Sequence, residues 1–179
     1  MEGYFNDLSN SLKCLPFNSI NQAASVLEKA RLSGKNLYSF GNGGSAATAL
    51  HIANDLSGIT VRKGPRFKIQ CLSSNISTIT AIANDYSYDA IFAHQLGNFI
   101  VPGDVVICMS ASGNSPNCIN ALTLAKELGG ITIGMTGFDG GRMRSLCDVS
   151  IHVPINSYYI VETAHLAVSH AISFILSPL

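Results

Sequence analysis

Short apolar runs alternate with amphipathic stretches along most of the chain, and this alternation predicts repeated strand–helix units. The apolar runs expected to form strands lie at residues 36–40, 68–72, 104–109, 131–135 and 149–153. Helical periodicity marks the segments 4–15, 19–33, 45–57, 75–84, 87–98, 115–128 and 157–176. Apolar strands that alternate with helices are typical of a parallel sheet covered on both faces, so we expect a single α/β domain over residues 1–179.

The most informative break in this pattern is the run Gly41-Asn42-Gly43-Gly44-Ser45, between the first strand and its helix. Glycines let backbone N–H groups approach an anion closely, and the helix that follows directs the positive end of its dipole toward that anion. Ser45 adds a hydroxyl at the helix start. The turn therefore indicates an anion site, although Gly-rich turns of this kind also occur for purely structural reasons.

A second turn, Ser110-Ala111-Ser112-Gly113-Asn114-Ser115, repeats the arrangement with serines and precedes a helix that begins near Pro116. Both turns follow strands, and ligands of parallel sheets bind at the carboxyl ends of strands. We interpret the pair as a phosphate site built from hydroxyls and backbone amides; the alternative is an ordinary turn rich in Ser and Gly. Neither turn carries a Walker or Gly-x-Gly-x-x-Gly pattern, which favours a small phosphorylated ligand over a nucleotide.

Titratable side chains gather on the helices beside these turns. His51 and Asp55 are four residues apart and share a helix face. Glu162 and His170 lie loosely on one side of the last helix, whereas His165 lies well round from His170. Histidines and carboxylates beside a phosphate site suit either a divalent metal ion or proton transfer. The alternative is that they are helix-surface residues or paired core histidines.

Charge is scarce: charged residues make up 12% of the chain and hydrophobic residues 47%, against roughly 25% charged in typical domains. This composition predicts that surface is hidden in a subunit interface. The net charge is zero and the pI is near 6.9, so nothing points to a nucleic-acid or anionic-membrane partner.

No targeting or membrane segment is expected, because the N-terminus does not resemble a signal peptide and no continuous apolar run reaches the about 20 residues of a membrane span. The five cysteines include no Cys-x-x-Cys pair. They are expected to be reduced, mostly buried thiols of a cytoplasmic protein.

The order and spacing of the motifs resemble those of the phosphoheptose isomerases, which are sugar isomerase (SIS) domain proteins, over nearly the whole chain. The matching motifs are the first turn, His51-x-x-x-Asp55-Leu-x-Gly58, Ala83-Asn84-Asp85-Tyr86, the second turn, Thr136-Gly137-x-Asp139-Gly140-Gly141 and Glu162-x-x-His165-x-x-x-x-His170. The resemblance implies a flavodoxin-like fold: a five-stranded parallel sheet sandwiched by helices, with N-terminal helices and a long C-terminal helix. It also implies a homotetramer with active sites between subunits.

The implied reaction converts sedoheptulose 7-phosphate to D-glycero-D-manno-heptose 7-phosphate for lipopolysaccharide or capsule synthesis. By the same resemblance, His51 and His170 belong to a metal site, His170 also transfers a proton, Asp85 lies near the sugar, and zinc is the implied metal. The residues that would hold the substrate phosphate are Asn42, Gly43, Ser45, Ser110, Ser112 and Ser115.

The chain departs from the family pattern at several positions. Asp55 stands where the family has its catalytic glutamate, and Glu162 stands where it has a glutamine. Ile59, Tyr159 and Ala111 replace an arginine, an aspartate and a threonine. A shortened base can cost a proton relay orders of magnitude in rate.

The two carboxylate changes can compensate each other, because the site keeps two histidines and two carboxylates. This favours a four-ligand metal site of His51, Asp55, Glu162 and His170, since close carboxylates repel unless a cation lies between them. Asp55, Glu162 and His170 are then the candidate acids and bases. Two alternatives stay open: a non-catalytic SIS protein that binds a sugar phosphate or a regulator, and an isomerase for a different sugar phosphate.

Overall fold

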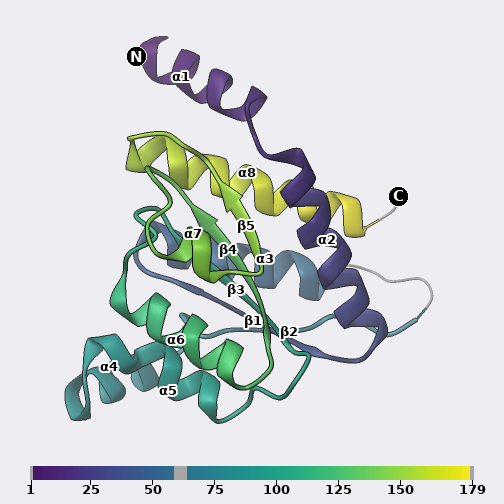
Figure 1. Cartoon of the computed structure of the whole chain (residues 1–179), viewed down its shortest axis with the longest axis vertical. Coiled ribbons are helices and arrows are strands. Elements are labelled where there is room, and N and C mark those ends of the chain that lie inside the picture. The colour runs from purple at the N-terminus through teal and green to yellow at the C-terminus, as the bar shows by residue number, and fades with distance from the viewer. Residues whose placement is uncertain (1, 59–63, 178–179) are drawn as a thin grey trace.

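A five-stranded parallel sheet forms the centre of the molecule (Figure 1). The structure is a computed structural model that describes residues 2–58 and 64–177. The strands, in their order across the sheet, are β2 (Lys68–Cys71), β1 (Asn36–Gly41), β3 (Val105–Ser110), β4 (Ile131–Thr136) and β5 (Val149–His152). All neighbouring pairs are parallel, and the order 2-1-3-4-5 is that of flavodoxin-like folds, which confirms the predicted fold.

Helices fill the segments between the strands and both ends of the described chain. They are α1 (Glu2–Lys13), α2 (Phe17–Leu32), α3 (Gly44–Gly58), α4 (Ile76–Asp85), the 3-10 turn η1 (Tyr88–Ala90), α5 (Ile91–Gly97), α6 (Pro116–Glu127), α7 (Met143–Leu146) and α8 (Tyr158–Leu176). Each predicted strand and helix is present, with ends that differ by no more than two residues; the helix expected over 87–98 is divided into η1 and α5.

Each face of the sheet has its own apolar core. On one face α2, α3 and α8 pack over the strands, and Ile52, Ile107 and Val168 belong to this core. On the other face lie α4, α5 and α6 (Figure 1), where Phe40 of β1 stacks on Phe92 of α5 with ring centroids 4.8 Å apart. The chain is therefore a three-layer sandwich, in which the central strand β3 is fully buried and the edge strand β2 is partly exposed.

The central strand β3 explains why its terminal turn is held firmly in place. Its residues alternate between the two cores, with Ile107 on one side and Val106 and Cys108 on the other. All of these side chains are at most 1% exposed, and burying a large aliphatic side chain stabilises a fold by about 1.5–3 kcal/mol. Both faces of the strand are therefore held by apolar packing, which supports the position of its last residue, Ser110.

Local signals set the helix ends. Gly34 and Gly129 follow α2 and α6 with φ values of 67° and 76°, a left-handed conformation that glycine adopts without the Cβ strain of other residues. Asn75 precedes α4, and its side chain accepts a hydrogen bond of 3.1 Å from the backbone N–H of Thr78.

Helix α8 is the element of the structure that is relevant to the expectation that the chain has no membrane segment. Within the described parts of the chain it is the one helix long and apolar enough, by length and composition, to cross a membrane. Core helices meet the same criterion, and Val168 and Ile172 of α8 are buried in the core beside α2 and α3. We therefore interpret α8 as a core helix, and its polar residues Glu162 and His170 lie against α3.

The topology places a crevice between β1 and β3. The chain leaves β1 toward β2 on one side and leaves β3 toward β4 on the other, so the connections diverge at the carboxyl ends of these two adjacent strands. Ligands of open α/β sheets bind at such a switch point. Gly41 and Ser110, the last residues of β1 and β3, lie there.

Candidate active site

The first turn fits against β3 only because it is built from glycine. A Cβ on Gly41 would lie 2.7 Å from the carbonyl oxygen of Met109, closer than real Cβ contacts. Gly43 has a φ of 54°, and α3 begins at the next residue. Ser45 is 5% exposed in the first turn of α3, so its hydroxyl and the free N–H groups of the helix start lie at the crevice.

The second turn brings serine hydroxyls together at the end of β3. The Oγ atoms of Ser110 and Ser115 lie 3.2 Å apart, within hydrogen-bond distance. Gly113 has a φ of 64°, and a Cβ there would collide with the carbonyl of Gly140 in the loop after β4. Glycine is thus required both by the backbone conformation and by the close approach of the neighbouring loop.

A cavity of about 170 Å³ lies between the two turns. Its lining residues are Asn42, Ser45, Ser110, Ala111, Ser112, Ser115, Tyr158 and Glu162. The four predicted serines all reach it, whereas Gly43 and Asp85 are not among the lining residues. The lining includes neither lysine nor arginine, so an anion here would be held by hydroxyls, backbone amides and the positive ends of α3 and α6.

Glu162 closes the cavity from the side of α8. Its carboxylate occupies the space that a side chain at Gly44 would fill, and a Cβ there would collide with it. Gly44 is the first residue of α3, and a carboxylate beside a helix N-terminus is stabilised by the helix dipole. The absence of a side chain at Gly44 therefore leaves the space that the Glu162 carboxylate occupies.

A second polar group lies where α3 meets α8. The Nε2 atoms of His51 and His170 are 2.7 Å apart, and Oδ2 of Asp55 lies 3.5 Å from Nε2 of His51. The three residues can each offer one ligand atom within 4.8 Å of the others. Two facing imidazole nitrogens need one proton or one cation between them. Imidazole nitrogens and a carboxylate oxygen are also suitable ligands for zinc, so the residues present fit a divalent metal ion.

The structure groups three of the four predicted metal ligands. Glu162 is not part of the His51–Asp55–His170 group, and its carboxylate lies on the cavity side, beside Gly44. The two groups are linked through α3, because Ser45 and His51 are six residues apart on it, which corresponds to about 9 Å along the helix axis.

Comparison with known proteins agrees with this arrangement. A family model described as SIS domain matches residues 3–137. The phosphoheptose isomerase of Rhodospirillum rubrum is 40% identical over 157 residues, which are 88% of this chain and 82% of that protein. The chain belongs to the SIS-domain phosphoheptose isomerase family.

A second relative matches a similar share of the chain, and a solved structure matches nearly the full length. The phosphoheptose isomerase of Aliarcobacter butzleri is 41% identical over 160 residues, covering 88% of this chain and 83% of the relative. The solved structure of phosphoheptose isomerase GmhA from Neisseria gonorrhoeae superposes with a TM-score of 0.91 at 29% identity, covering 98% of this chain and 95% of that one.

Other sequence-predicted positions of this SIS-domain chain lie elsewhere. Asp85 is exposed at the end of α4, where its Oδ1 accepts a hydrogen bond of 2.9 Å from the Asn84 amide. Tyr159 is 79% exposed, and Ile59 lies outside the described residues. Reasoning from the sequence missed Tyr158, which lines the cavity; its spacing of four residues from Glu162, one helical turn, was the available signal.

His165 has a different environment from the other histidines of this SIS domain. It is 1% exposed, and neither ring nitrogen has a hydrogen-bond partner in residues 2–58 and 64–177. Burial lowers the pKa of His165 to about 4, so the imidazole is neutral at physiological pH. It is therefore a core residue behind the site.

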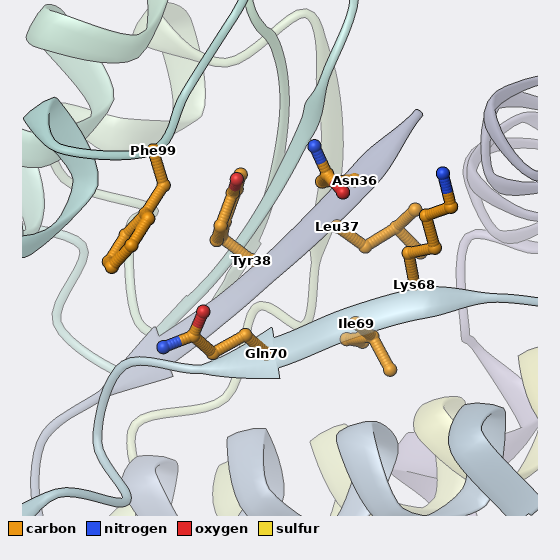
Figure 2. A pocket seen from close by; sticks show the side chains of 7 residues that line it. All are labelled: Asn36, Leu37, Tyr38, Lys68, Ile69, Gln70 and Phe99. Atoms are coloured by element: carbon orange, nitrogen blue, oxygen red, sulfur yellow. The ribbon is translucent and has the colours of Figure 1, made fainter. Parts of the chain in front are cut away.

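A wider cavity of about 390 Å³ lies beside the amino-terminal halves of β1 and β2 (Figure 2). Its lining residues are Asn36, Leu37, Tyr38, Lys68, Ile69, Gln70 and Phe99. Neither of the predicted turns and none of the grouped histidines and carboxylates contributes to it. The two predicted turns lie instead at the opposite, carboxyl ends of β1 and β3.

Proposed function

We propose that the chain is an aldose–ketose isomerase that converts sedoheptulose 7-phosphate to D-glycero-D-manno-heptose 7-phosphate. The observation that carries the proposal is the serine-lined cavity, which lies at the start of the same helix that carries His51 and Asp55. A phosphate held by the serines would leave the carbon chain of a heptose free to extend along α3 toward these two residues. Membership of the phosphoheptose isomerase family supports this choice of substrate.

In this proposal the phosphate binds Ser45, Ser110, Ser112 and Ser115, assisted by backbone amides at Asn42 and Gly43. The serine hydroxyls line the cavity, whereas neither lysine nor arginine among the described residues does. No cationic side chain of the lining is therefore left unpaired when the ligand is absent. Asp85, exposed on α4, would contact the sugar across a subunit interface.

Isomerisation moves a proton between the first two carbons of the sugar through an enediol. One of Asp55, Glu162 or His170 takes the proton from C1 of the ketose, and another returns a proton to C2. Both His170 and Glu162 project from α8 toward α3, so that both could reach a substrate that lies along this helix. The proximity of the reacting groups is what would convert a slow solution reaction into a fast one.

His51, Asp55 and His170 would hold a divalent metal ion, which we propose is zinc. When bound, such an ion polarises the carbonyl and hydroxyl oxygens of the substrate. The fourth ligand predicted from the sequence, Glu162, stays a prediction. In the proposal its carboxylate serves the substrate from the cavity side.

We further propose a cytoplasmic homotetramer with active sites between subunits. Several large apolar side chains are exposed on the isolated chain, including Phe5 of α1 at 60%, Phe17 of α2 at 59% and Ile76 of α4 at 75%. All five cysteines are free thiols, as expected in a reducing compartment.

The deciding experiment measures turnover of sedoheptulose 7-phosphate by the purified chain, with the metal content determined on the same sample. Turnover with bound zinc supports the proposal. Bound metal without turnover moves the search to other sugar phosphates, for which the exposed Tyr159 in place of the family aspartate gives a specific reason. A sample with no bound metal and no turnover favours a non-catalytic SIS protein.

A further inference from the structure

A pair of side-chain amides, distant in the sequence, joins the two turns that contain Gly41 and Ser110. Asn42 lies in the first of these turns, and Asn117 lies in the first helical turn of α6, which follows the second. The Nδ2 of Asn42 donates to Oδ1 of Asn117 over 2.9 Å, and the Nδ2 of Asn117 donates back to Oδ1 of Asn42 over 2.9 Å. Two reciprocal bonds of this kind fix both the separation and the relative orientation of the turns.

Two further donors determine which way each amide points. The hydroxyl of Tyr88 in η1 donates to Oδ1 of Asn42 over 2.9 Å, and the backbone N–H of Cys118 donates to Oδ1 of Asn117 over 2.9 Å. Each amide oxygen therefore accepts two hydrogen bonds, which is its usual capacity. The network is consistent only with this orientation of the two amides.

Burial makes the pair energetically significant. Asn117 is 1% exposed, and a buried amide that loses its partner keeps the cost of removal from water. Asn42 lines the cavity, but its oxygen is fully used by Asn117 and Tyr88, which leaves one N–H free. Its side chain is thus arranged primarily to hold protein groups together.

We propose that the Asn42–Asn117 amide pair, oriented by Tyr88, is a positioning device that holds the two turns at the separation one phosphate group requires. This inference rests on the proposed phosphate site. The serines bind the ligand, and the amide pair keeps Ser45 on one turn and the Ser110–Ser115 group on the other in place before the ligand arrives. Preorganisation of this kind strengthens binding because the ordering cost is already met during folding.

A double-mutant cycle with inorganic phosphate as the probe tests the inference. Asn42→Ala, Asn117→Ala and the double variant are titrated with phosphate by calorimetry, and folding is checked by thermal unfolding. Each single variant is expected to weaken phosphate binding about 10-fold. The double variant should bind phosphate no more weakly than the weaker-binding of the two single variants, because either change alone removes both reciprocal bonds. Tyr88→Phe should give a smaller loss of about 2-fold to 3-fold.

Asn120→Ala provides the matched control. Asn120 is an exposed amide on α6 that donates to the backbone of Asp89 over 3.2 Å, so it also contacts η1 without joining the turns. The phosphate affinity of Asn120→Ala should stay within about 2-fold of that of the wild type, since a single, partly exposed hydrogen bond contributes little.

The outcomes separate this inference from the proposed function. No phosphate binding by the wild type contradicts the proposed site itself. Wild-type binding that Asn42→Ala and Asn117→Ala leave unchanged overturns the positioning role. Additive losses in the double variant also overturn it, because they would mean that the two amides act on the phosphate independently. Should Asn117→Ala fail to fold, Asn42→Ala and Tyr88→Phe still decide the question.

Discussion

The two ends of the sheet differ in how their polar groups are used. Beside the amino-terminal halves of β1 and β2, the larger cavity (Figure 2) adjoins groups paired for structural purposes. The fully buried Asp104 accepts hydrogen bonds from the backbone N–H of Asn36 at 2.9 Å and of Val101 at 3.1 Å, and Lys68 donates to the carbonyl of Gly34. These bonds close loops and leave little for a ligand.

At the carboxyl ends of the strands, the cavity is smaller but its polar groups face one another. The hydroxyls of Ser110 and Ser115 pair with each other there. Outside the cavity lining, where α3 meets α8, the Nε2 atoms of His51 and His170 lie 2.7 Å apart. When a ligand binds, such groups can exchange these hydrogen bonds for hydrogen bonds to the ligand at little cost in free energy. At these two cavities, the availability of polar atoms indicates the candidate site better than cavity volume does.

The largest effect is expected for His170→Ala, in the group that His170 forms with His51 and Asp55 between α8 and α3. Loss of a general acid or base reduces kcat/KM by about 10²–10⁴-fold, and Asp55→Asn should fall in the same range. Steady-state kinetics with sedoheptulose 7-phosphate, on samples of known metal content, measure both. Glu127→Gln removes an exposed carboxylate on α6 and serves as the control. Retention of more than a tenth of the activity in His170→Ala would exclude it from the proton relay.

The next largest effect concerns the stability of the fold. Buried Asp104 accepts hydrogen bonds from the backbone, whereas buried His165 has none within the described residues. His165 lacks hydrogen-bond partners in the described chain, and burial lowers its pKa from 6.5 to about 4. The unfolded state then binds more protons below pH 6.5, so stability falls as the pH decreases from 6.5 toward 4. A shift of this size corresponds to about 3 kcal/mol.

His165→Met removes this titration and keeps a side chain of similar volume. Urea unfolding of both proteins at pH 7.5 and pH 4.5 should show a smaller loss of stability in the variant on acidification, by about 2–3 kcal/mol. Equal losses in the two proteins would mean that the imidazole is protonated in the folded state.

Gly44→Ala should have a moderate effect confined to activity. The new Cβ displaces the Glu162 carboxylate, a flexible side chain, so kcat/KM should fall roughly 10-fold while the free energy of unfolding changes by less than about 1 kcal/mol. Kinetics and urea unfolding check the two parts. Gly97→Ala is the matched control, because its Cβ would meet only Leu124 at an ordinary 3.6 Å. A loss of stability without a loss of activity would contradict the assigned place of Glu162.

The sequence predicted the framework of this site well because the signals were local. Apolar runs fixed the strands, and the turns at Gly41 and Ser110 then had to meet at one edge of a parallel sheet. The spacing of His51 and Asp55 on one helix was equally readable.

Contacts between distant segments were not predictable in this way. Nothing in the sequence near Asn117 indicates that it pairs with Asn42, 75 residues away. The seat of Glu162 beside Gly44 depends on how α8 crosses α3, which follows from packing in the core. These contacts decide that Glu162 lies on the cavity side, apart from the His51–Asp55–His170 group.

The smallest effect is expected at the amino-terminal cavity, where Gln70→Ala should leave kcat/KM within about 2-fold, the range of surface changes away from a site. Gln70 is an exposed lining residue on β2 that pairs in register with Tyr38, before the first turn begins at Gly41, and it does not line the cavity between the two turns. The kinetic assay used for His170→Ala measures it directly. A clear loss of activity would mean that the two ends of the sheet are coupled, and polar-atom availability would then be an incomplete criterion for the site. An unchanged rate, beside a large loss in His170→Ala, confines the function to the smaller cavity and the paired histidines behind it.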